Sequence, residues 1–170
     1  NFKTDYLPLV DFAKDNNLKF IATNIPRRYA SFVYYNGLDT LKNLSEEAKS
    51  FLPPLPIEYD ETLRGYQEMI EMSGGHGGDN LPKSQAIKDA CMAHNILVNL
   101  PENGVFIHYN GAFHSKFRDG IVWYLLNENP GLTIVTIDAH EQDDISDLDE
   151  QRIGAANFII ATPSNLTKTH

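Results

Sequence analysis

Four short runs of apolar, largely β-branched residues constrain the fold of this chain more than any other feature. They lie at 18–23, 105–109, 132–137 and 158–162. Each run is mostly apolar on both faces, which is typical of strands in a parallel sheet that is covered on both sides. Segments with helical spacing lie between the runs and predict βα units. The sequence therefore predicts an α/β fold of three layers, α/β/α, with a mostly parallel sheet of about four strands.

The first two predicted strands are separated by a long stretch without any strand pattern. Helical patterns occupy 58–72 and 80–100, and the glycine-rich segment SGGHGG at 73–78 interrupts them. We expect a helical insertion at about 41–100 that stands over one edge of the sheet. The chain has 170 residues, a length that suits one domain spanning 1–170.

The charge balance excludes one class of partner. The chain has 23 acidic and 14 basic residues and a net charge of -9. Such a chain has no broad cationic surface to neutralise a phosphate backbone, so nucleic acid is excluded as a partner. No apolar run reaches the roughly 18 residues that a membrane-spanning helix needs.

The loops that follow the first three predicted strands carry candidate binding residues, and those after the third are Asp138 and His140. Asn24, Arg27 and Arg28 follow the first strand, where a helix begins. Unpaired N–H groups and guanidinium groups at a helix start favour a carboxylate or a phosphate. Gly111 and His114 follow the second strand, and the glycine permits a tight turn. Because the carboxyl ends of parallel strands share one edge, we expect these loops to share one rim.

Each of these candidates also has a purely structural interpretation. Arg27 could pair with a carboxylate such as Asp89 and tie the insertion to the sheet. We interpret His108, inside a predicted strand, as a core histidine with satisfied ring nitrogens. Asp138 and His140 precede an acid-rich loop, so we expect them on a solvated face.

The helix predicted at 80–100 has two distinct stripes. Gln85, Asp89 and Met92 fall on one of them, whereas Ile87 and Cys91 fall on the other. The polar stripe is either the solvent side of the helix or a surface that faces something specific. We interpret Cys91 as an inert packing residue.

Five segments resemble, in order, the ChaN-like haem-binding proteins, which share a superfamily with the erythromycin esterase and Tiki proteins. The segments are DYLPLVDFA at 5–13, IATNIPR at 21–27, FLPPLP at 51–56, SQAIKDACMA at 84–93 and GAFHS at 111–115. The superfamily is marked by two GxxH motifs. The second is present here as Gly111 and His114, and we expect the first on an N-terminal strand upstream of this chain. Ser84 stands where the family has alanine.

The resemblance implies a non-catalytic haem-binding protein of bacterial iron or haem uptake. It also implies a homodimer in the cell envelope, either periplasmic or held to the membrane only by a lipid anchor on the N-terminal segment. A sheet without its first strands would expose an unpaired edge, so the chain should dimerise, swap elements or aggregate.

The resemblance further implies a tyrosine oxygen on the haem iron with help from a histidine, because a phenolate suits ferric iron. Among the tyrosines we expect Tyr66, with His76 nearby, to serve this role; the alternatives are Tyr29, Tyr59 and Tyr109. The other haem-binding candidates are Asn24, Arg27, Arg28, Gln85, Asp89 and His114, and the two arginines would meet the propionates.

Two other functions remain open at this point. One is a hydrolase of the Tiki or erythromycin esterase kind, in which His114 and the histidine of the first motif activate water, with or without a metal ion. The other is a scaffold whose rim binds a partner peptide.

Overall fold

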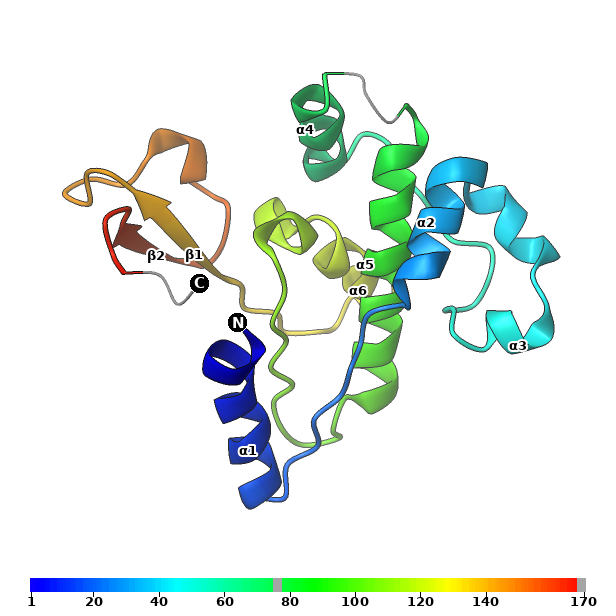
Figure 1. The fold of residues 1–170 in the computed structure, drawn as a ribbon, viewed down its shortest axis with the longest axis horizontal. Helices are drawn as coiled ribbons and strands as arrows, with labels where there is room; N and C mark the ends of the chain where they lie inside the picture. The colour runs from blue at the N-terminus through cyan, green and yellow to red at the C-terminus, as the bar shows by residue number, and fades with distance from the viewer. Residues whose placement is uncertain (75–77, 168–170) are drawn as a thin grey trace.

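A computed structural model describes residues 1–74 and 78–167 (Figure 1). Its elements are, in order, the π-helix η1 (Phe2–Tyr6), α1 (Leu7–Asp15), α2 (Arg27–Asn36), η2 (Leu38–Asn43), α3 (Glu46–Lys49), α4 (Arg64–Met72), α5 (Asn80–Asn99), η3 (Ala112–His114), η4 (Lys116–Arg118), α6 (Ile121–Glu128), β1 (Ile137–Gln142), η5 (Glu150–Arg152) and β2 (Phe158–Pro163). The helices η2 to α5 occupy the stretch in which the sequence predicts an insertion.

Helix α5 is the centre of the molecule, with α2 packed on one side and α6 on another (Figure 1). The helix carries Pro82 in its first turn, where the missing N–H costs nothing, and ends just before Pro101. Small buried residues such as Ala86, Ala90 and Ala93 let the neighbouring helices approach closely. This close packing allows a single helix to serve two cores.

The two cores lie on different sides of α5. The core toward α2 is built from Ile25, Tyr29, Ala30, Val33, Leu41, Leu52, Ile87 and Cys91. The core toward α6 is built from Ala90, Met92, Ala93, Ile96, Ile121, Tyr124 and Leu125. Cys91 is buried and unoxidised, in agreement with its interpretation as a packing residue.

The sheet differs from the prediction. The described residues contain one parallel pair, β1 and β2, with Ile137 opposite Phe158. The molecule is thus a mixed α/β protein, but the sheet of about four strands is not formed. The third apolar run, 132–137, enters β1 only with its last residue. Runs 18–23 and 105–109 are not strands: within the described residues their only backbone hydrogen bond outside helices and strands runs from the Leu18 N–H to the Ala13 carbonyl at the end of α1, and none joins them to another extended segment.

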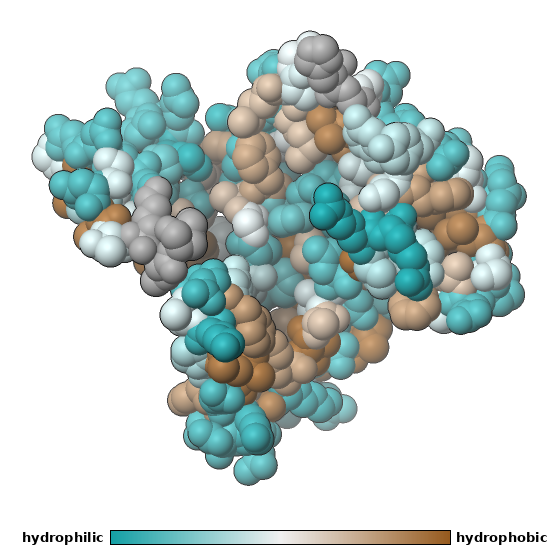
Figure 2. Space-filling model, viewed as in Figure 1, coloured by the Kyte–Doolittle hydropathy of each residue, from teal (hydrophilic) through white to brown (hydrophobic). Residues whose placement is uncertain are grey.

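The unpaired runs nevertheless lie close together, and burial alternates along 105–109 and over 20–23 of the other run. Thr23 Oγ1 lies 2.8 Å from His108 Nε2, which brings the two segments into contact near their carboxyl ends. Phe20 and Ile107 are exposed by 57% and 70%, so one face of this pair is uncovered. Figure 2 shows apolar side chains gathered along α1 and the segments beside it.

Within the described ranges, no helix is both long and apolar enough to span a bilayer.

Candidate functional site

The turn that carries His114 is tightly folded. It consists of η3 and η4 and ends at Gly120, whose φ is +53°. Phe117 and Arg118 also have positive φ values, of 59° and 64°. Such backbone strain in residues other than glycine persists only where the surroundings enforce it. A Cβ atom on Gly120 would lie 2.5 Å from the His114 carbonyl oxygen, so glycine is required here for the turn to close.

Asp89 forms the centre of a buried polar cluster and is itself 0% exposed. Its Oδ1 lies 2.5 Å from His114 Nδ1. Its Oδ2 accepts a hydrogen bond of 3.0 Å from the hydroxyl of Tyr66. Burial raises the pKa of Asp89 from 3.8 to about 6, and the hydrogen bonds from His114 and Tyr66 oppose that rise. The carboxyl group thus depends on both partners for its charge.

Tyr66 cannot serve as an open iron ligand in this conformation. Its side chain is 1% exposed, and its ring stacks on Tyr59 with the centroids 5.6 Å apart. Burial and the neighbouring Asp89 carboxylate raise the pKa of Tyr66 far above its usual value, so the group remains a neutral phenol. The expectation that Tyr66 binds haem iron does not fit this geometry, because its oxygen already donates to Asp89.

His114 is the most accessible member of the cluster, with a side chain 18% exposed. When Nδ1–H donates to Asp89, the lone pair of Nε2 is the remaining acceptor on the ring. The amide nitrogen of Gln85 also contacts the ring, 2.8 Å from Nδ1 and 3.3 Å from Nε2. A carboxylate behind Nδ1 is typical of histidines that bind a metal and of histidines that act as a general base. The geometry is suited to both kinds of chemistry.

Helix α4 holds Tyr66 in place through contacts with the histidine turn. The Gly65 N–H donates to Asp119 Oδ2 at 2.8 Å. Lys116, only 9% exposed, forms an ion pair with Glu68. Burial alone would raise the pKa of Glu68, but the hydrogen bonds from Lys116 and then from Arg64 outweigh it and lower that pKa. Sequence reasoning missed this clamp, because no spacing relates α4 to the turn at 112–119.

His108 braces the other side of the turn. Its Nε2 contacts Thr23, and its Nδ1 lies 3.0 Å from Asn110 Oδ1. Asn110 in turn donates to Ser115 Oγ at 2.9 Å. Both ring nitrogens are therefore satisfied, as the sequence interpretation predicted, and burial lowers the pKa of His108.

The arginine-bearing loop lies on the surface at the start of α2. Arg27 is exposed and takes part in none of the ion pairs in the described part of the chain. Its suggested pairing with Asp89 is wrong, because His114 occupies that carboxylate. Arg28 lies over the ring of Tyr29, 4.8 Å from its centroid. Asn24 accepts a hydrogen bond from the next residue's backbone N–H.

Two further residues singled out in the sequence are His76 and Asp138. His76 lies outside the described residues. Asp138 is 7% exposed, so the expectation of a solvated face is wrong for it. Its Oδ2 lies 3.6 Å from Arg152 Nη1. The described ranges contain no group of three His, Cys, Asp or Glu side chains that could hold a metal ion.

The structure thus brings four predicted residues together, Tyr66, Gln85, Asp89 and His114. The contact between Thr23 and His108 places the starts of two of the predicted rim loops side by side. Neither Arg27 nor His114 lines either of the two cavities described for this molecule, which lie beside the segment 53–58.

Comparison with known proteins adds one finding. A family model described as "Haem-binding uptake, Tiki superfamily, ChaN" matches residues 1–125. No curated protein and no solved structure matches the chain.

Proposed function

Because this chain belongs to the ChaN family of haem-binding uptake proteins, we propose that it binds haem in bacterial iron or haem uptake, through the cluster around His114. The observation that carries the proposal is the 2.5 Å contact between His114 Nδ1 and the buried Asp89. A carboxylate in this position fixes the tautomer in which Nε2 carries the lone pair, with the Gln85 amide nitrogen 3.3 Å from it. Imidazole is a common axial ligand of haem iron.

Two arginines and Tyr66 have roles beside His114 in this proposal. His114 Nε2 would hold the iron of a bound haem, and the haem would supply a redox-active, Lewis-acidic metal centre. Arg27 and Arg28 are exposed at the start of α2, and guanidinium groups pair well with carboxylates such as the propionates. Tyr66 would not contact the haem; it would hold Asp89 in place as the second hydrogen-bond donor to that carboxylate. In this proposal His114 replaces Tyr66 as the iron ligand.

A hemin titration followed by absorption spectroscopy tests the assignment. The wild-type protein should shift the Soret band of hemin with saturation. His114→Ala should weaken that shift and change the spin state of the iron. Tyr66→Phe, which removes only a buried hydroxyl, should keep the wild-type spectrum. A tyrosinate-type spectrum that disappears in Tyr66→Phe would contradict the role of His114, and the absence of any shift in the wild type would contradict haem binding.

The same pair supports a second candidate, a hydrolase that uses His114 as a general base. A buried carboxylate that orients an imidazole is the arrangement that activates water or a hydroxyl nucleophile. The expected evidence is cleavage of an ester or peptide panel, with or without an added divalent cation, that is lost in both His114→Ala and Asp89→Asn. Unchanged cleavage in His114→Ala would exclude this role.

Dimerisation and location complete the proposal. We expect a homodimer in the bacterial cell envelope, periplasmic or lipid-anchored. The uncovered apolar faces of 18–23 and 105–109 support association, because apolar surface of this kind is usually buried against a partner. Light scattering that reports a monomer would contradict the dimer, and recovery of the protein from the cytoplasmic fraction would contradict the location.

A further inference from the structure

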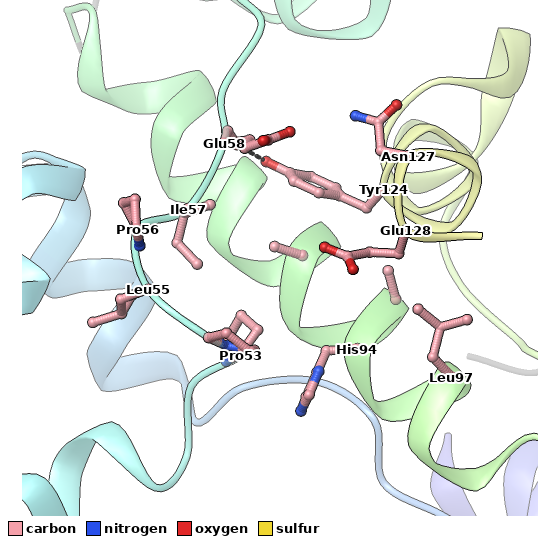
Figure 3. Close-up of a pocket in the computed structure, with 13 residues that line it drawn as sticks. Pro53, Leu55, Pro56, Ile57, Glu58, His94, Leu97, Tyr124, Asn127 and Glu128 are labelled. Atoms are coloured by element: carbon pink, nitrogen blue, oxygen red, sulfur yellow. Dashed lines mark hydrogen bonds between the residues drawn. The ribbon is translucent and has the colours of Figure 1, made fainter. Parts of the chain in front are cut away.

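A groove runs along a face of α5 that the His114 cluster does not use (Figure 3). Its floor is the helical stripe Ala90, Ala93, His94 and Leu97, and its walls are the segment 53–58 and the end of α6. The cavity there measures about 200 Å³. A second cavity of about 380 Å³ shares His94 and the residues 53–55 with it, so the groove continues past the histidine. Two alanines in the floor leave the space open.

The middle of the groove is apolar and offers backbone acceptors. Three of the wall residues are prolines, which have no backbone N–H group: Pro53, Pro54 and Pro56. This wall therefore offers few hydrogen-bond donors. The backbone carbonyl groups of 53–57 accept no hydrogen bond from the described residues. The wall is held in place where Tyr124 donates its hydroxyl hydrogen to the Glu58 carbonyl at 2.6 Å. A ligand with apolar groups and N–H donors would complement this surface.

The two ends of the groove carry opposite charge. Glu58 and Glu128 line one end, and Figure 3 shows Glu128 pointing into the groove from the last turn of α6. The carbonyl groups at a helix C-terminus add negative potential there. Lys42 and Lys49 line the other end. Lys49 already pairs with Glu46 at 2.8 Å, whereas Lys42 takes part in none of the described ion pairs.

We propose that this groove binds a short apolar peptide with free ends. Its N-terminal ammonium group lies at Glu128, its C-terminal carboxylate lies at Lys42, and its N–H groups meet the carbonyls of the proline-rich wall. Charge complementarity sets the direction of the chain, and the apolar floor takes the side chains. A haem molecule has carboxylates at one edge and no ammonium group at the other, so it does not match both charged ends of the groove.

The probe is the tripeptide Leu-Ala-Leu in three forms: free, N-acetylated and C-amidated. Calorimetry measures the affinity, and NMR follows the ring resonances of His94, which lies between the two cavities. The free peptide should bind with saturation and shift the His94 signals. Blocking either end should weaken binding by about fivefold, as expected for the loss of one partly exposed charge pair.

Two variants assign the ends of the peptide. Glu128→Gln should favour the free over the acetylated peptide less than the wild type does, with Glu58 left as the remaining carboxylate at that end, and should still prefer a free carboxylate. Lys42→Met should bind the free and the amidated peptide equally and should still prefer a free ammonium group. Glu150→Gln, a change of the same charge on the distant η5, should behave as the wild type.

Four results would overturn the proposal. The first three are no saturable binding of the free tripeptide, equal binding of all three forms to the wild type, and shifts at His114 in place of His94. Saturation of the His94 shift by hemin, with no shift caused by the peptide, would assign the groove to haem and would also overturn it.

Discussion

Replacing Tyr66 by Phe removes one hydroxyl group from the buried centre and leaves the stacked ring in place. The hydroxyl donates to Asp89 Oδ2 at 3.0 Å, inside a cluster where Asp89 is 0% exposed. A hydrogen bond to a charged group contributes roughly 1.5–3 kcal/mol, and the carboxylate oxygen loses that partner without gaining water. We therefore expect Tyr66→Phe to lower the free energy of unfolding by about 2 kcal/mol, which corresponds to about 4–8 °C in Tm for a chain of this size.

Urea denaturation followed by far-UV circular dichroism measures the change, and two controls bracket it. Tyr124→Phe also removes a buried hydroxyl, but that group donates to a neutral carbonyl, so about 1 kcal/mol should be lost. Tyr35→Phe changes a side chain that is 78% exposed and should leave stability unchanged.

A double-mutant cycle isolates the interaction itself. In the Asp89→Asn background the acceptor is neutral, so adding Tyr66→Phe should cost about half as much as it costs in the wild type. Equal costs in both backgrounds would refute the reasoning, because the hydroxyl would then stabilise the fold without interacting with the Asp89 charge. A loss as small as that of Tyr35→Phe would refute it as well.

Three further predictions concern the residues around the cluster. Gly120→Ala should unfold the histidine turn and abolish any His114-dependent activity, whereas Gly154→Ala, which also has a positive φ but faces open space, should only reduce Tm modestly. Cys91 should resist thiol reagents in the native state and react on unfolding, because burial raises its pKa to about 11; rapid native labelling would contradict this. Glu68→Gln should lower stability at neutral pH, because the folded-state pKa of Glu68 is lowered. That stabilisation exists above the unfolded pKa and disappears as pH falls through the folded value, so wild type and variant should converge in acid; a difference that grows in acid would contradict the sign.

Much of the candidate site was predictable because its residues lie at informative positions in local sequence. Gln85 and Asp89 share one stripe of a helix, and His114 follows a glycine at a turn. Helical periodicity and turn chemistry depend only on neighbours in sequence, so both were accessible without coordinates. The role of Tyr66 was not accessible in this way. Its distance from Asp89 and its burial are properties of packing, and they convert an expected iron ligand into a hydrogen-bond donor.

The predicted four-stranded sheet shows what local sequence could not predict. The apolar runs 18–23 and 105–109 have the composition of strands, but a strand also needs the backbone of a neighbour for its hydrogen bonds. The composition of a run indicates its strand propensity but does not specify which segment will pair with it. The two runs have no regular secondary structure and form no strand pair within the described residues, whereas β1 and β2 pair with each other.

The sequence alone determined the long central helix, the two stripes on it, the tight turn at His114 and the buried cysteine, because these follow from periodicity and from the backbone preferences of glycine and proline. Tertiary structure alone decided that Asp89 pairs with His114 and not with Arg27, that Lys116 and Glu68 clamp α4, and that a charged groove opens beside the proline-rich segment. These features join residues distant in sequence, and only the packing of whole helices sets which side chains meet.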